Sequence, residues 1–465
     1  MNAMHRDLIR LVERIEAEDA PRAAKDPARQ RWHLQPPTGW LNDPNGLCVY
    51  GGRYHAFYQY APFAADGSGA KFWGHAVSTD LVHWQGLPVM LCPDQPYDIH
   101  GVYSGSALAE GEEMYLYYTG NVKHSGDYDY IIAGRDHNVC LAISRDGVTM
   151  AEKTCLLYNA DYPAGLTCHV RDPKVFAFEG RYYMVLGART LENVGEVLVW
   201  ESADKRHWTH INTLKTSAPF GYMWECPDLF EVDGRWFLAV SPQGLAQQGN
   251  RYQNVYASGY FPVKGDWRTG GTLGEFEEFD KGFDYYAPQS FYDPLKDRRV
   301  QLGWMGMPDA DYTNPLECGW QHCLTAPCVL SARGDRLLRT PAAELEACRD
   351  AGRTTPAGEH CLPLCFDWEL TPAGDFCLEL RDSLRLAFAG GTFTMELTSP
   401  AAFGRTVRRA DTAQLHSVRV LGDASSAEVF LNGGETVLTT RYYPAPDCRT
   451  ARLQGAEGAL YALRV

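Results

Sequence analysis

Three short phrases of the sequence combine a carboxylic acid with a nearby proline. They are residues 40–46 (WLNDPNG), 171–173 (RDP) and 225–228 (ECPD). Cleavage of a glycosidic bond needs such acids, because one carboxylate attacks the sugar carbon while another carboxyl group protonates the leaving oxygen. Asp43, Asp172 and Glu225 are therefore the candidates for this chemistry. A single Asp-Pro pair is more often an ordinary turn, so the hypothesis requires a fold that brings the three phrases together.

The three phrases belong to a pattern that recurs about every 60 residues. The successive positions Asp43, Ser104, Asp172, Glu225 and Ala287 are 61, 68, 53 and 62 residues apart. Each precedes a segment rich in aromatic and aliphatic residues, which favour strands. These segments are 52–60, 112–120, 180–188, 234–242 and 298–306. Such a repeat is typical of one β-propeller blade, so the sequence predicts an all-β fold with five blades over residues 30–335. Two stacked sandwiches are the alternative, but they need no repeated phrase.

A propeller would place one of these positions from every blade beside the central channel. Proline lacks a backbone donor and tends to begin or end strands, so each acid is expected at a strand start facing the channel. Asn42 and backbone amides are expected to lower the pKa of Asp43. These features predict an ionised Asp43.

The other two acids need different surroundings. Glu225 must stay partly protonated, which requires desolvation or a nearby negative charge, and Trp224 and Cys226 could supply an apolar wall. The preceding Arg171 is expected to hold Asp172 ionised, so that it could bind sugar hydroxyls.

The segments outside residues 30–335 show other sequence patterns. Residues 1–29 begin with apolar residues at helical spacing and predict a helical extension. Residues 336–352 predict a short helical linker. Residues 353–465 contain short alternating runs separated by turns such as Gly390-Gly391, which is typical of a small β-sandwich. The sequence therefore predicts a propeller followed by a C-terminal β-sandwich with a structural role.

Composition narrows the class of protein. The formal charge of −15 argues against nucleic acid or an anionic membrane as a partner. No signal peptide or apolar membrane span is evident, so the fourteen cysteines are expected to be reduced, mostly buried side chains of a cytoplasmic protein. CxxC motifs are absent, and His75, His169 and His322 lack the spacing of a metal site. We expect neither a metal nor a cofactor.

The ordered phrases resemble glycoside hydrolase family 32, the β-fructofuranosidases, over nearly the whole chain. The similarity includes residues 55–60 (HAFYQY), 73–78 (WGHAVS), 103–106 (YSGS), 283–289 (FDYYAPQ) and 428–435 (EVFLNGGE). It implies a five-bladed propeller joined to a β-sandwich. It also implies Asp43 as nucleophile, Glu225 as acid/base and Asp172 as transition-state stabiliser. The intracellular sucrose-6-phosphate hydrolase branch looks most similar.

The resemblance also implies a set of sugar-binding residues: Trp40, Leu41, Asn42, Gln59, Tyr103, Ser104, Arg171, Tyr286 and Trp304. Trp304, Tyr286 and Trp320 could equally pack between blades. One departure concerns the loop 62–72, where relatives often carry a Trp; Phe63 or Phe72 could replace it. A second departure is Cys328, where relatives often carry an Arg.

The implied activity is retaining hydrolysis of terminal β-D-fructofuranosides such as sucrose, sucrose 6-phosphate or short fructooligosaccharides. The two carboxyl groups should then lie about 5–5.5 Å apart. A fructosyltransferase and a non-catalytic fructan-binding protein are the alternatives. A phosphate group on the sugar would need a cation at the channel mouth, for which Lys71, Arg135 and Lys174 are possible. Both a monomer and a homodimer remain open.

Overall fold

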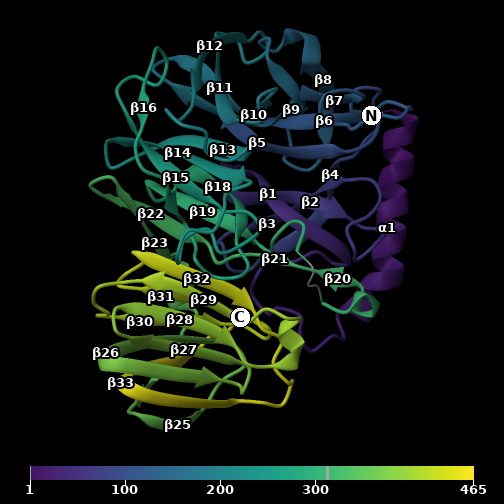
Figure 1. Ribbon diagram of the computed structural model, residues 1–465. Helices are drawn as coiled ribbons and strands as arrows, with labels where there is room; N and C mark the ends of the chain where they lie inside the picture. Colours follow the sequence, from purple (N-terminus) through teal and green to yellow (C-terminus); the bar gives the residue numbers. More distant parts are fainter. Residues whose placement is uncertain (1, 311–313) are drawn as a thin grey trace.

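The computed structural model describes residues 2–310 and 314–465, which fold into a five-bladed β-propeller and a C-terminal β-sandwich (Figure 1). Each blade is an antiparallel sheet whose four main strands follow one another from the channel outward. The predicted fold class is confirmed, and the alternative of two stacked sandwiches is wrong. The repeated aromatic segments are the second strands of the five blades.

The strands of the blades have the following bounds. The first blade contains β1 (Gly39–Tyr50), β2 (Arg53–Ala61), β3 (Phe72–Ser78) and β4 (Gln85–Leu91). The second contains β5 (Val102–Glu110), β6 (Glu113–Lys123), β7 (Arg135–Ser144) and β8 (Met150–Leu157). The third contains β9 (Leu166–Phe178), β10 (Arg181–Thr190), β11 (Gly195–Ser202) and β12 (Thr209–Leu214).

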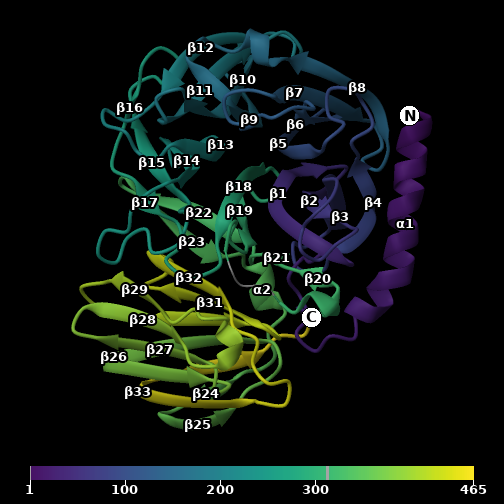
Figure 2. The same cartoon turned by 45° about the vertical axis from the view of Figure 1, so that its right-hand side comes forward.

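The fourth blade contains β13 (Met223–Val232), β14 (Arg235–Gln243), β15 (Gly259–Lys264), β16 (Thr272–Leu273) and β17 (Glu277–Glu278). The fifth contains β18 (Tyr286–Asp293), β19 (Arg298–Met305), β21 (Cys323–Leu324), β22 (Cys328–Arg333) and β23 (Arg336–Pro341). The short strand β20 (Trp320–Gln321) then pairs in parallel with the start of β1. This pairing ties the connection between β19 and β21 of the fifth blade to the first blade and closes the ring (Figure 2).

Segment 336–352 differs from the predicted helical linker. Its first six residues form β23, the outer strand of the fifth blade, and only α2 (Glu344–Ala347) is helical. In β23 the side chains of Leu337, Arg339 and Pro341 are buried in alternation, which suits a strand on a half-buried sheet. The AAELEA run favours a helix in sequence, but pairing with β22 decides the structure of residues 336–341.

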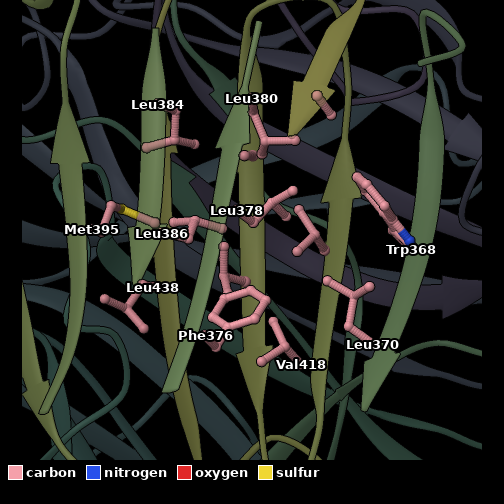
Figure 3. Close-up of a cluster of buried hydrophobic side chains, with 14 of the residues drawn as sticks. Trp368, Leu370, Phe376, Leu378, Leu380, Leu384, Leu386, Met395, Val418 and Leu438 are labelled. Atoms are coloured by element: carbon pink, nitrogen blue, oxygen red, sulfur yellow. The ribbon is translucent and has the colours of Figure 1, made fainter. Parts of the chain in front are cut away.

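The C-terminal sandwich contains ten strands. They are β24 (Arg353–Thr355), β25 (Gly358–Cys361), β26 (Phe366–Leu380), β27 (Leu384–Ala389), β28 (Thr392–Leu397), β29 (Val407–Asp411), β30 (Val418–Gly422), β31 (Ser426–Leu431), β32 (Thr436–Arg441) and β33 (Thr450–Ala462). Alternate residues of these strands, among them Trp368, Leu378 and Leu386, fill one buried apolar core (Figure 3). This domain therefore has its own core and lies beside the fourth and fifth blades (Figure 1).

The N-terminal segment forms helix α1 (Ala3–Ala23), which lies along the first blade (Figure 2). Val12 is buried in the core of that blade, and Leu8 and Ile9 pack against it. The side chain of Asn2 caps the helix by accepting a hydrogen bond from the backbone of His5 at 2.7 Å. Among the described residues, no helix combines the length and apolar character that crossing a bilayer would need. The cytoplasmic location stays a prediction.

All fourteen cysteines lie within the described residues and are free thiols. Six of them are buried, seven are partly buried, and Cys361 is exposed. The expectation that most would be buried is therefore met only in part. Cys328, one departure from the family pattern, is among the fully buried ones.

Buried ion pairs join the propeller to the sandwich. His33 Nδ1 lies 2.8 Å from Asp423 Oδ2, and His33 Nε2 lies 2.9 Å from Glu428 Oε1. Burial alone would lower the pKa of His33, but its hydrogen bonds to the two carboxylates outweigh that effect and raise the pKa to about 9. The protonated imidazole therefore links the segment before β1 to β31 and the turn before it.

This junction predicts a pH-dependent stability. Because the pKa of His33 is raised on folding, its stabilisation is complete below the unfolded pKa of about 6.5 and is lost as the pH rises through about 9. The contribution is roughly 3 kcal/mol. The thermal midpoint should fall between pH 6.5 and pH 9, and it should fall less in His33→Gln. An equal fall in both proteins would contradict this role for His33.

Candidate active site

The channel-facing strand of every blade carries one extra residue at the position that the sequence repeat marks. In the first blade Leu41 pairs with Tyr60 and Pro44 with Tyr58, so Asn42 and Asp43 together face one residue of β2. Equivalent register shifts lie at Ser104, Asp172 and Ala287, and in the fourth blade at Cys226, directly after Glu225. Each marked residue therefore lies at a β-bulge or directly beside one, and such a bulge re-aims a side chain within a strand.

Two of the acids are not at strand starts, as the prolines had suggested, whereas Glu225 lies near the start of β13 (Met223–Val232). Asp43 and Asp172 lie well inside β1 and β9. The prolines are tolerated there because these strands are blade edges and because a bulge interrupts the hydrogen-bond ladder. Asp172, Cys226 and Ala287 have φ of 63°, 47° and 45°, which is strained for non-glycine residues. The same local distortion thus recurs around the channel.

Asp43 accepts hydrogen bonds from three side chains. Ser104 Oγ donates to Oδ2 at 2.5 Å, and Asn42 Nδ2 donates to Oδ1 at 3.1 Å. Cys226 Sγ lies 3.6 Å from Oδ2. Burial nevertheless raises the pKa of Asp43, and the nearby charge of Glu225 adds to this, so the expected lowering is wrong. Desolvation of the carboxylate outweighs its hydrogen bonds.

Glu225 is held by three donors. Arg171 Nη2 donates to Oε1 at 2.6 Å, while Tyr286 Oη and Gln243 Nε2 donate to Oε2 at 2.6 and 2.8 Å. Trp224 does not form the suggested apolar wall. Its indole is buried on the other side of β13, where it packs against Phe261 and donates to the Phe220 carbonyl oxygen. The surroundings of Glu225 are thus polar and fix both carboxyl oxygens.

Asp172 is not held ionised by Arg171, as the sequence had suggested. Its Oδ2 accepts from the backbone N–H of Cys226 at 2.9 Å, but its distance to Arg171 Nε is 3.9 Å. Burial raises the pKa of Asp172 to about 7, since the lowering effect of Arg171 is outweighed by desolvation and the charges of Glu225 and Asp43. Arg171 bonds directly to Glu225 instead.

The three acids line one cavity of about 550 Å³ at the channel mouth. Eight of the nine residues expected to bind sugar also line it: Trp40, Asn42, Gln59, Tyr103, Ser104, Arg171, Tyr286 and Trp304. Leu41 is the exception. Its side chain is fully buried, because alternation along β1 turns it away from Trp40 and Asn42.

Aromatic rings form one wall of this cavity. Trp304 lies 6.0 Å from Trp40 and 6.3 Å from Tyr286 between ring centroids. Gly67, from the loop after β2, lies against the Trp40 ring, where a β-carbon would come within 2.8 Å. Phe63 and Phe72 pack against each other and do not line the cavity. Trp40 and Gly67 therefore line the cavity on the side of the loop that follows β2.

Trp320 serves packing rather than the cavity. Its Nε1 donates to Asp26 Oδ2 at 2.8 Å, and the guanidinium of Arg29 lies 4.9 Å from its ring. Lys174, named as a possible phosphate ligand, donates to the Ser290 carbonyl oxygen and lies 3.6 Å from Asp228. It does not line the cavity that holds the acids.

The structure adds lining residues that the sequence did not single out. Gln243 is the most consequential, because it bonds to Glu225. Gln243 is the last residue of the second strand of its blade, and Gln59 lies near the end of β2; this similar placement is the signal that could have found Gln243. The others are Asp66, Gly67, His137, Pro308 and Asp309.

One group of side chains among the described residues has donors close enough for a metal ion: His5, Cys92 and Asp94. His5 Nδ1 lies 2.9 Å from Cys92 Sγ and 3.1 Å from Asp94 Oδ2. Lys153 Nζ lies 2.5 Å from the other oxygen of Asp94. These contacts fasten α1 to the propeller, and none of the three residues lines the cavity of the acids.

Comparison with known proteins places these observations in one family. The model described as "Glycosyl hydrolases family 32 N-terminal domain" matches residues 33–341, and the corresponding C-terminal model matches residues 350–462. The chain is 39% identical to a protein named sucrose-6-phosphate hydrolase from Bacillus subtilis (strain 168), over 94% of this chain and 93% of that protein. It is 37% identical to a raffinose invertase from Escherichia coli, over 92% of each.

Solved structures agree with this. The sucrose-6-phosphate hydrolase from Lactobacillus gasseri has a TM-score of 0.88 at 27% identity and covers 97% of this chain and 96% of its own. The Bombyx mori β-fructofuranosidase has a TM-score of 0.87 at 28% identity, and the match covers 99% of this chain and 98% of that chain.

Proposed function

The chain belongs to glycosyl hydrolase family 32, and from this premise we propose that it hydrolyses terminal β-D-fructofuranosides such as sucrose, its 6-phosphate or short fructooligosaccharides. The observation that carries the proposal is the convergence of Asp43, Asp172 and Glu225 on one cavity from three different blades. The relatives named sucrose-6-phosphate hydrolase and β-fructofuranosidase support the sugar class.

The first step of the proposed reaction is attack by Asp43 on the anomeric carbon of the fructosyl unit. Ser104 and Asn42 orient this carboxylate. Glu225 gives its proton to the departing glycosidic oxygen, and a covalent fructosyl-enzyme forms. The donors Arg171, Tyr286 and Gln243 then stabilise the carboxylate that Glu225 becomes.

The second step releases fructose. Glu225 takes a proton from a water molecule, which attacks the anomeric carbon from the face that the leaving group vacated. Two displacements on opposite faces retain the anomeric configuration. Asp172, with its raised pKa, is placed to hydrogen-bond to sugar hydroxyls as either donor or acceptor.

Product analysis tests both the reaction and its stereochemistry. With sucrose, glucose and fructose should appear in equal amounts, and NMR should detect β-fructofuranose before the α anomer forms by mutarotation. Initial release of the α anomer would contradict the double displacement. A large excess of free glucose over free fructose would instead indicate transfer of the fructosyl unit to another sugar.

A further inference from the structure

A second large cavity lies between helix α1, segment 31–37 and strands β2, β3 and β4 of the first blade. Its volume is about 640 Å³, compared with about 550 Å³ for the cavity of the acids, and both are in the usual range for small-molecule sites. Among the described residues, none lines both cavities. Tyr58 lines the second cavity and its neighbour Gln59 lines the cavity of the acids, because alternate residues of β2 face opposite sides of the sheet. We call the second cavity the α1 cavity.

Aromatic rings form part of the wall of the α1 cavity. The ring of Tyr58 lies against Gly74 of the neighbouring strand β3, where a β-carbon would have no room. Trp84, just before β4, is half-buried and keeps part of its ring accessible. Two residues later, a β-carbon at Gly86 would meet no atom within 4 Å, so the space beside it is open. Such rings provide a flat apolar surface with room for a ligand ring to pack on it.

Three polar side chains of this wall have unused hydrogen-bonding capacity. Trp32 is 4% exposed and His75 is 1% exposed, and neither Trp32 Nε1 nor His75 Nδ1 has a partner in the described part of the chain. The other ring nitrogen of His75 lies 3.0 Å from His55 Nδ1. Tyr58 Oη also has no hydrogen bond to any described residue. Unpaired buried polar groups are unfavourable, so this wall points to a ligand that both donates and accepts hydrogen bonds.

Carboxylates lie on the opposite, helical side. Glu13 and Glu16 of α1 are three residues apart and both line the cavity. Tyr60 Oη donates to Glu16 Oε1 at 2.9 Å. Burial raises the pKa of Glu16, the bond from Tyr60 opposes this change, and the like charge of Glu13 adds to it. Carboxylate oxygens accept strong hydrogen bonds from hydroxyl groups, so this side complements the donors of the aromatic wall.

The balance of charge distinguishes the α1 cavity from the cavity of the acids. Lys71 and Arg135, which the sequence suggested as phosphate ligands, line the cavity of the acids together with Arg171. In the α1 cavity, Arg31 is exposed at the rim, and the protonated His33 is already paired with its two carboxylates. With Glu13 and Glu16 opposite, no single sign of charge dominates. A neutral ligand rich in hydroxyls therefore suits this cavity better than an ion.

We propose that the α1 cavity is a second, non-catalytic site that binds a neutral mono- or disaccharide. One face of a sugar ring carries C–H groups that would pack on Trp84 and Tyr58. Its hydroxyls each donate and accept, so they would donate to Glu16 and accept from the unpaired donors of the aromatic wall. The inference goes beyond the proposed function, because it concerns a cavity that none of the three acids lines.

Fluorine NMR of the full chain labelled with 5-fluorotryptophan tests the proposal. Trp84 reports on the α1 cavity and Trp40 on the cavity of the acids, and Trp236 on β14 lines neither. The Asp43→Asn background prevents cleavage of sucrose. Titration with sucrose, glucose and fructose should shift the Trp84 signal with a Kd in the millimolar range or tighter for at least one of them, while the Trp236 signal stays in place. Sodium phosphate and putrescine should leave the Trp84 signal unchanged.

Tyr58→Phe removes one hydroxyl from the wall and should raise the Kd read from Trp84 about tenfold, while the Kd of sucrose read from Trp40 stays the same. Tyr292→Phe is the matched control: Tyr292 is 53% exposed, donates to Asp297 at 2.7 Å and lines neither cavity, so both Kd values should equal those of the parent protein.

Two results would overturn the sugar assignment while the proposed function stands. One is a Trp84 signal that ignores all three sugars, or responds only to phosphate or putrescine, although sucrose shifts the Trp40 signal. The other is a Kd at Trp84 that Tyr58→Phe leaves unchanged. A wild-type protein that releases no fructose from sucrose or its 6-phosphate would overturn the proposed function instead, and a sugar-dependent shift at Trp84 would still support the second site.

Discussion

Asp43→Asn should lower kcat/KM for sucrose by at least four orders of magnitude, a loss of the size seen when other enzymes lose a nucleophile. The amide has the shape of the carboxylate, so Ser104 can still contact it. It lacks the negative charge that attack on the anomeric carbon requires. Initial rates of glucose release measure the effect, and the thermal midpoint shows whether the variant is folded.

Asp335→Asn provides the control for this substitution. Asp335 is an exposed carboxylate on the β22–β23 turn, 3.2 Å from Arg235 and from Lys264, and it lies outside the cavity. Exposed ion pairs contribute little to stability, so activity and midpoint should stay close to the wild-type values. A folded Asp43→Asn protein that turns over sucrose within tenfold of the wild-type rate would exclude Asp43 as the nucleophile.

The repeated spacing of the acid phrases was sufficient to predict the blade number, because each blade must begin with a strand at the channel. The same spacing could not show how the acids are presented. Asp43 and Asp172 were expected at strand starts, yet they lie at bulges inside β1 and β9. A bulge depends on the register between two paired strands, and a single strand's sequence does not contain that register.

The pKa shifts of Asp43 and Asp172 could not be predicted from the sequence either. The neighbours of Asp43 and Asp172 in the chain, Asn42 and Arg171, suggested lowered pKa values. In the fold, burial and the mutual charge of the acids raise both values. Arg171 is adjacent to Asp172 in sequence, but its guanidinium bonds to Glu225 from another blade. Tertiary contacts therefore decide which acid each donor serves.

His137 and Lys174 show the same limit. His137 is a single histidine on β7 with no surrounding motif, and only the fold shows that it lines the cavity without a hydrogen-bond partner. Lys174 lies one residue from the RDP phrase and was a reasonable candidate by sequence. Its side chain instead reaches Ser290 and Asp228, away from the acids.

Glu225→Gln should lower kcat/KM for sucrose by about 10²- to 10⁴-fold, because glutamine cannot protonate the leaving oxygen. With β-D-fructofuranosyl fluoride the outcome should differ. Fluoride departs without a proton, so Asp43 can still form the fructosyl-enzyme, but no base then activates the water that releases it. Rapid-mixing measurement should therefore show a burst of one fluoride ion per enzyme molecule, followed by slow turnover.

The burst separates the roles of the two acids, which loss of activity alone does not. Asp43→Asn lacks the group that attacks, so it should give no burst with the same fluoride. Gln243→Leu is a matched comparison for Glu225→Gln: it removes one donor at 2.8 Å from Glu225 but keeps the carboxyl group, so it should turn over the fluoride without accumulating an intermediate. If Glu225→Gln gave steady turnover without a burst, a residue other than Glu225 would be the base of the second step. If Asp43→Asn gave the burst, the covalent bond would form elsewhere in the cavity.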